Sequence, residues 1–336
     1  MASPTNAPHS SGTQVPLEIE KHVAYIQKLG ESKDLAYHLT THLRLNAVYW
    51  GLTALSIMKR PEALDRTAMI EYVMSCWDEQ AGGFGAHPQH DAHIHATLSG
   101  IQVLCMQNAL DRLDIPRVTK FILSLQNENG SFSGDRFGEV DTRFGYIAVN
   151  ALSLLGQLDK LDREKTIGYI RRCRNFDGGF GATEGAESHA SQAWVCTGTL
   201  AILDAIEEEV DVDTLAWWLA ERQLPNGGLN GRPEKLEDVC YSFWVLSTLS
   251  ILQRLHWIDA PALIRFILSA QDHEGGGIAD RPEDMADVFH TIFGLAGLSL
   301  MGYPQLAGLD PVYCMPAELI EKMGLRKNWV ALPRQV

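Results

Sequence analysis

Gly227-Gly228-Leu229-Asn230 is one of five copies of a glycine-led tetrapeptide that recurs along the chain. The leading glycines stand at positions 82, 130, 178, 227 and 276, so successive copies are 48, 48, 49 and 49 residues apart. The second copy has Ser131 where the others have their second glycine. Such a fixed period indicates a repeat architecture, in which each repeat is one supersecondary unit.

Two apolar segments accompany each glycine copy. The segment after the glycines is apolar nearly all round and rich in Ala, Gly and Ser, which predicts an inner helix buried on several sides. The segment before the glycines has one charged face and one apolar stripe, which predicts a half-exposed outer helix. The inner helices are expected over residues 141–155, 189–203, 238–252 and 287–301, and outer helices over 117–126, 213–223 and 261–271.

A further pair of segments, residues 18–29 and 43–58, brings the number of predicted helical hairpins to six. The expected fold is all-α: an α6–α6 barrel, or toroid, closed by six hairpins. An open solenoid is the alternative, but its familiar hairpin repeats run about 34 to 47 residues and lack this glycine loop. With no break in composition, residues 16–336 are predicted to form one domain of ~48-residue repeats, and residues 1–15 a flexible tail.

Composition limits the functions to consider. The 336 residues are 46% hydrophobic, which provides for a large core, and their net charge of −14 argues against nucleic acid or an anionic membrane as the main partner. The sequence shows no transmembrane segment and no signal peptide. Its six cysteines are scattered without a CxxC pair, which favours free thiols in a reducing compartment, so a cytoplasmic location is expected.

The repeat register also predicts a site. Counting ten residues from the second position of each tetrapeptide reaches the start of each inner helix. The inner helices of a ring of hairpins all begin at the same end, so residues at these starts should meet at one mouth although they are far apart in sequence. The residues expected to converge there are Arg143, His189, Asp238, Cys240 and His290.

A carboxylate, a thiolate and an imidazole from Asp238, Cys240 and His290 form a ligand set that suits Zn²⁺. Each residue also has a purely structural explanation: the aspartate as a helix N-cap, the cysteine as core packing, the histidine as a buried polar group. Asp238 and Cys240 are two residues apart and would diverge on a helix. They can face one ion only if Asp238 precedes the helix.

A second group of polar residues adjoins the first. Arg232 offers a planar fork for phosphate oxygens and Lys235 a compact positive charge, although both could belong to an ordinary surface loop. His189 and Tyr241 could donate hydrogen bonds nearby. Below them, the inner helices carry aromatic side chains that either fill the core or line a central cavity: Tyr49, Trp50, Tyr146, Trp194, Phe243, Trp244, Phe289 and Phe293.

The five repeats, Asp238-Val239-Cys240-Tyr241 with His290, and the Arg232/Lys235 loop resemble the β subunits of protein prenyltransferases. The resemblance covers residues 17 to 325 or so. Within that family the chain is most similar to β subunits of the type II, or Rab, geranylgeranyltransferases, on the stretches 221–225, 231–241, 255–259 and 279–282. The resemblance implies a catalytic subunit that transfers a C20 geranylgeranyl group from geranylgeranyl diphosphate to C-terminal cysteine thiols of Rab GTPases.

The resemblance also implies roles for individual residues. Asp238, Cys240 and His290 match the family's ligands for one Zn²⁺, while a need for Mg²⁺ is left open. Four residues match its diphosphate-binding set: His189, Arg232, Lys235 and Tyr241. Arg232, Lys235 and Tyr241 are also expected to be catalytic, together with the three zinc ligands. The cavity for the lipid is expected to be lined by Asn46, Trp50, Tyr146, Trp194, Trp244 and Phe289.

Donor length and partners are further implications of the resemblance. Farnesyl-specific relatives have a tryptophan where this chain has Asn46, and the smaller residue should leave a deeper cavity for a C20 lipid. The implied partners are a prenyltransferase α subunit in an obligate heterodimer and a Rab GTPase presented by Rab escort protein. The chain is not expected to be an integral membrane protein.

Other functions remain as alternatives at the level of sequence. The chain could be the β subunit of a farnesyltransferase or of a type I geranylgeranyltransferase, or a non-catalytic helical-repeat scaffold. A barrel glycosidase would use paired carboxylates among Asp141, Asp238 and Asp287, but Cys240 and the neighbouring cations fit that chemistry poorly. The Asp-rich acid motif of terpene cyclases, which share the helical toroid, is not found.

Overall fold

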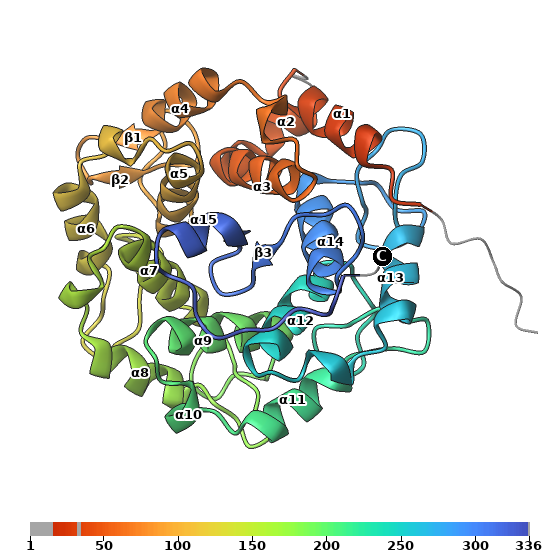
Figure 1. Cartoon of the computed structure of the whole chain (residues 1–336). Coiled ribbons are helices and arrows are strands. Elements are labelled where there is room, and N and C mark those ends of the chain that lie inside the picture. The colour runs from red at the N-terminus through yellow and green to blue at the C-terminus, as the bar shows by residue number, and fades with distance from the viewer. Residues whose placement is uncertain (1–15, 32–34, 335–336) are drawn as a thin grey trace, which may run out of the picture.

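The inner helices form a closed ring (Figure 1). The computed structural model describes residues 16–31 and 35–334, and the tail predicted over residues 1–15 lies outside them. Each inner helix packs against the next, and the last packs against the first. In order around the ring they are α3 (Arg44–Ile57), α5 (Ile94–Met106), α7 (Thr142–Leu154), α9 (Ala190–Ile202), α12 (Tyr241–Ile251) and α14 (Val288–Leu300).

An outer ring of helices surrounds the inner one (Figure 1). Five of the six outer helices begin at an aspartate whose side chain accepts a hydrogen bond from the backbone N–H three residues further on. This N-cap satisfies one of the free amides at the helix start. The outer helices are α1 (Ile19–Leu29), α4 (Arg66–Ser75), α6 (Ile115–Ser124), α8 (Arg163–Arg172), α11 (Val212–Ala220) and α13 (Ala260–Ser269). Shorter helices, α2 (Leu35–Leu39) and α10 (Ile206–Glu209), lie between them.

The ring is closed by the first and last repeats. His22 of α1 is fully buried, and its Nδ1 accepts a hydrogen bond from the backbone N–H of Gly277 at 2.8 Å. Its Nε2 therefore carries the proton and donates to Oε1 of Gln271 at 3.0 Å. Because an open solenoid would leave these two repeats apart, the contacts confirm the barrel and exclude the solenoid.

The glycine tetrapeptides connect each outer helix to its inner helix. Their third residue is buried in every copy and anchors the loop in the core: Phe84, Phe132, Phe180, Leu229 and Ile278. In the first copy the loop forms two short antiparallel strands, β1 (Trp77–Asp78) and β2 (Gly83–Phe84). Gly227 has a φ of +91°, and a Cβ at this position would lie 2.5 Å from the carbonyl oxygen of Ala262. The loop therefore needs glycine there for both conformation and space.

A segment near the C-terminus enters the ring, which the repeat pattern did not predict (Figure 1). It contains β3 (Leu309–Asp310), paired with β4 (Met315–Pro316), and continues into α15 (Ala317–Lys322). Its backbone carbonyls accept hydrogen bonds from side chains of four inner helices: Tyr49 to Cys314, Gln102 to Tyr313, Tyr146 to Val312 and Trp194 to Pro311. The segment thereby closes the barrel at the end away from the starts of the inner helices.

Within the part of the chain that the structure describes, none of the helices has the length and apolar character needed to cross a bilayer.

Candidate metal and lipid site

The turn before α12 brings Asp238 and Cys240 together. The helix begins at Tyr241, with Cys240 as its N-cap residue, so Asp238 lies outside the helix. Oδ1 of Asp238 accepts a hydrogen bond from the backbone N–H of Cys240 at 2.7 Å. The side chains of Asp238 and Cys240, which would diverge on a regular helix, therefore face the same point. This meets the condition that the sequence set for a shared ion, namely that Asp238 precedes the helix.

His290, in the first turn of α14, completes the cluster. Its Nε2 lies 3.3 Å from Oδ1 of Asp238. The candidate ligand atoms of Asp238, Cys240 and His290 all lie within 4.8 Å of one another. Among the described residues, this is the group of histidine, cysteine and carboxylate side chains whose ligand atoms lie close enough together to hold one metal ion. The sequence register had placed them at one mouth, and the structure brings them together.

Asp287 positions the imidazole of His290. One carboxylate oxygen of Asp287 caps α14 by accepting a hydrogen bond from the backbone N–H of His290 at 2.8 Å. The other carboxylate oxygen lies 2.6 Å from Nδ1 of the His290 ring. Nδ1 therefore carries a proton that it donates in a hydrogen bond to Asp287, and Nε2 points towards Asp238. Such an outer carboxylate is typical of histidines that bind metals. From the sequence, Asp287 was considered only as a carboxylate of a barrel glycosidase; its spacing of three residues from His290 was the available signal.

The electrostatics of the cluster favour a cation. Burial opposes protonation of His290, yet hydrogen bonds to Asp238 and Asp287 outweigh it and raise its pKa to about 9. Burial also opposes ionisation of Asp238, but hydrogen bonds from His290 and Cys240 lower the pKa of this carboxyl. Burial and the adjacent Asp238 hold the pKa of the Cys240 thiol well above its usual value. A divalent cation would remove the cost of ionising the thiol, so the donor set fits a metal such as zinc.

Two of the predicted diphosphate residues lie beside this cluster: Tyr241 directly follows Cys240, and His189 contacts Tyr241. His189 caps α9, and its Nε2 lies 3.4 Å from the hydroxyl of Tyr241. Burial, and then the charge of Arg232, lower the pKa of His189, so its ring is neutral near pH 7. Burial raises the pKa of Tyr241 to about 12 and keeps its hydroxyl protonated. Arg232 forms an ion pair with Glu187, and Lys235 is exposed in the same loop.

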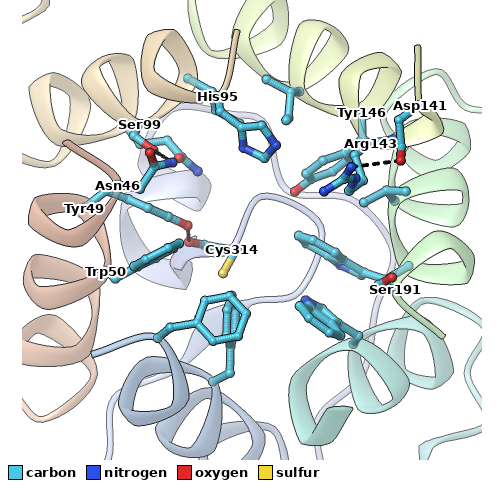
Figure 2. Close-up of a pocket in the computed structure, with 18 of the residues that line it drawn as sticks. Asn46, Tyr49, Trp50, His95, Ser99, Asp141, Arg143, Tyr146, Ser191 and Cys314 are labelled. Atoms are coloured by element: carbon cyan, nitrogen blue, oxygen red, sulfur yellow. Dashed lines mark hydrogen bonds and ion pairs between the residues drawn. The ribbon is translucent and has the colours of Figure 1, made fainter. Parts of the chain in front are cut away.

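A cavity of about 350 Å³ occupies the centre of the barrel (Figure 2). All six residues predicted to line a lipid cavity do line it: Asn46, Trp50, Tyr146, Trp194, Trp244 and Phe289. Tyr49 and Phe293 line it as well, whereas Phe243 is fully buried and packs behind the wall, against Trp194 and Phe293. The aromatic residues of the inner helices therefore surround a cavity rather than fill the core.

The floor and the rim of the cavity include residues that sequence reasoning did not assign to it. Cys314 comes from the C-terminal segment, and Ser99 accepts a hydrogen bond from Asn46 at 3.0 Å (Figure 2). Arg143 also lines the cavity, where it pairs with Asp141 at 2.9 Å. No repeat signal points to Cys314, because its segment lies outside the repeats.

The α/α barrel, its aromatic cavity and the polar cluster at the starts of its inner helices together define a class of protein. Residues 17–315 match the family described as prenyltransferase alpha-alpha toroid domain, and the chain belongs to that family. Among its relatives, the geranylgeranyl transferase type-2 subunit beta of Saccharomyces cerevisiae is 52% identical over 309 residues, which are 90% of this chain and 95% of the yeast protein. The geranylgeranyl transferase type-2 subunit beta 1 of Arabidopsis thaliana is 50% identical over 95% of this chain and 99% of its own length.

A solved structure has the same fold. The protein geranylgeranyltransferase-I of Candida albicans, complexed with GGPP, matches 92% of this chain and 99% of its own with a TM-score of 0.84. Its sequence identity is 20%, so this similarity bears on the fold alone. The expected toroid and the resemblance to prenyltransferase β subunits are both confirmed.

Proposed function

We propose that this chain is the catalytic β subunit of a type II protein geranylgeranyltransferase, which transfers a C20 group from geranylgeranyl diphosphate to C-terminal cysteines of Rab GTPases. The observation that supports this most directly is the cluster of Asp238, Cys240 and His290, in which the ring of His290 packs edge-on against Phe289 of the aromatic cavity wall. The proposed partners are an α subunit and a Rab GTPase presented by its escort protein, and the proposed location is the cytoplasm.

The three residues of the cluster would hold one Zn²⁺. When bound, zinc supplies a site where an acceptor thiol loses its proton and becomes a thiolate nucleophile. An unperturbed thiol, with a pKa of about 8.5, is mostly protonated at neutral pH. Asp287 keeps Nε2 of His290 turned towards the cluster by accepting a hydrogen bond from Nδ1–H.

The neighbouring cations and hydrogen-bond donors would act on the leaving group. In the transfer, a bond forms between the sulfur and C1 of the lipid while the bond from C1 to oxygen breaks, and diphosphate departs with the electron pair. Arg232 and Lys235 supply positive charge for it, and Tyr241, with its hydroxyl kept protonated, supplies a hydrogen bond. Fixed donors of this kind stabilise charge that develops in the transition state.

The cavity would bind the isoprenoid. Burial is worth about 0.8 kcal/mol per CH₂, so a C20 chain could contribute on the order of 10 kcal/mol even when burial is incomplete. The aromatic residues that line the cavity, such as Trp50, Trp194 and Trp244, supply an apolar surface for it. A glycosidase has less support, because Asp141 is paired with Arg143 and Asp287 with His290.

The test is the purified heterodimer, obtained by co-expression with a candidate α subunit. We expect one zinc per β subunit by elemental analysis, and transfer of a labelled geranylgeranyl group to a Rab–escort complex. Cys240→Ala or His290→Ala should abolish zinc binding and turnover while circular dichroism stays unchanged. Full zinc occupancy in both variants would remove these residues from the ligand set. A folded wild-type heterodimer without zinc or transfer would favour the scaffold alternative.

A further inference from the structure

Two strongly exposed apolar side chains lie in the loops that carry the metal cluster. Leu236 is 67% exposed and Met285 is 89% exposed. Each stands two residues before an aspartate of the site, Asp238 and Asp287 respectively. The two loops are joined by a hydrogen bond of 2.8 Å from the backbone N–H of Val239 to the carbonyl of Asp280. The two apolar side chains therefore belong to adjacent loops at the mouth.

The repeat register identifies the equivalent positions in two other loops. Four of the loops contain a residue with a left-handed φ, between +63° and +77°: Gln89, Gly185, Glu234 and Glu283. Because this turn recurs, the residues two positions after it are structurally equivalent. These residues are Asp91, Glu187, Leu236 and Met285. The position is thus acidic in two loops and apolar in the two that carry the metal cluster.

The acidic residues at this position pair with the next repeat. Asp91 lies 3.1 Å from Arg136, and Glu187 is paired with Arg232. Arg281 follows Arg232 by 49 residues and would be the corresponding partner for a carboxylate at position 236.

Leu236 stands there instead of a carboxylate, and Arg281 pairs with Asp280 at 2.9 Å and with Asp284 at 3.3 Å. The series of ion pairs between repeats is therefore interrupted at the metal cluster by exposed apolar side chains. Apolar surface that gathers at one place, rimmed by polar residues, is typical of an interaction site.

The charge around Met285 indicates what kind of partner fits. Residues 280–287 contain four carboxylates and one guanidinium, so this rim is acidic. If the lipid fills the cavity, a polypeptide whose cysteine reaches the cluster must run outward over the mouth. The residues next to that cysteine then cross the loops that carry Leu236 and Met285.

We propose that Leu236 and Met285 form the docking site for the acceptor polypeptide, where they contact an apolar residue close to its reactive cysteine. The acidic loop attracts lysine or arginine residues further along the same polypeptide. This inference rests on the proposed function and adds to it the surface that recognises the acceptor.

The test compares acceptor kinetics of two heterodimers with those of the wild type. One carries Leu236→Ser together with Met285→Ser. The matched control carries Phe176→Ser, because Phe176 is also a strongly exposed apolar residue next to a glycine tetrapeptide, but in a repeat without metal ligands. We expect the double variant to raise KM for the Rab–escort acceptor about tenfold, while kcat, the KM for geranylgeranyl diphosphate and the zinc content stay unchanged. The control should match the wild type.

A second measurement identifies the contact itself. A Rab acceptor in which the apolar residue next to the reactive cysteine is changed to serine should lose affinity for the wild-type enzyme. With the double variant, the same change in the acceptor should cause little further loss of affinity, because the effects of substitutions at residues in contact do not add. Additive losses, or an unchanged KM in the double variant, would overturn the docking site and leave the proposed function standing.

Two other outcomes would also overturn the inference. Loss of binding to the α subunit in the double variant would assign the two side chains to the subunit interface. A wild-type heterodimer that binds zinc but transfers no lipid would remove the proposed function, and the docking site with it.

Discussion

At the scale of single residues, Asp287 has a role that its position as a helix cap conceals. Asp287→Asn keeps an oxygen for the cap but removes the charged acceptor for Nδ1 of His290. We expect zinc affinity to fall by about 10- to 100-fold, as is usual for outer carboxylates of metal-bound histidines. Chelator competition measures the affinity. Asp141→Asn is the matched control, because Asp141 caps α7 in a repeat without metal ligands, and equal losses in both variants would contradict the role.

Asn46 offers a second prediction at the same scale. It lines the cavity next to Ser99, so Asn46→Trp should fill part of the space available to a long isoprenoid. A single lost or displaced methylene in an apolar pocket changes discrimination by about 10- to 200-fold. We expect the ratio of kcat/KM for the C20 donor to that for a C15 donor to fall by at least about tenfold. An unchanged ratio in a folded variant would show that another part of the cavity limits chain length.

At the scale of elements, the glycine loops depend on two separate properties of glycine. Gly227 and Gly138 have nearly equal left-handed φ angles, +91° and +92°. A Cβ at Gly227 would collide with the backbone of Ala262, whereas a Cβ at Gly138 would meet nothing within 4 Å. The pair therefore separates conformational strain from steric conflict.

We expect Gly138→Ala to lower the free energy of unfolding by about 1 to 2 kcal/mol, the cost of the left-handed backbone. Gly227→Ala should lower it by a further 1 to 3 kcal/mol or so, because the added methyl group forces the backbone apart. Urea unfolding of both variants measures the difference. Equal losses would mean that the loop moves to accommodate the Cβ, and that glycine is required at position 227 only for its φ angle.

At the scale of the whole molecule, His22 joins the first repeat to the last. It is buried with both ring nitrogens hydrogen-bonded, to Gly277 and Gln271. His22→Ala leaves those partners unsatisfied, so we expect a loss of about 1 to 3 kcal/mol in the free energy of unfolding at pH 7.5. Hydrogen exchange should show faster opening of α1 and of the loop at residues 271–278, where the ring closes.

This loss should depend on pH. Burial lowers the pKa of His22 in the folded chain. As pH falls below about 6.5, the unfolded chain takes up a proton that the folded chain does not, so the contribution of His22 declines. The difference in unfolding free energy between the wild type and His22→Ala should therefore be smaller at pH 5.5 than at pH 7.5. A difference that grew as pH fell would mean that His22 is charged in the fold.

Much of the site could be predicted because it follows the repeat. The period of the glycines sets the register of the inner helices, and a closed ring brings their starts to one end. Asp238, Cys240 and His290 could therefore be placed together before any coordinates. Asp287 escaped assignment, because a helix cap and a partner for a metal ligand look the same in sequence.

The sequence by itself determined the hairpins, their register and the level at which the polar residues meet, because these follow from periodicity along one chain. The tertiary structure decided what lies inside the ring. The aromatic side chains could have filled the core, and the C-terminal segment carries no repeat signal. Only the packing of that segment against Tyr49, Tyr146 and Trp194 closes one end of the barrel and leaves a cavity inside the ring, because cavities depend on contacts between residues distant in sequence.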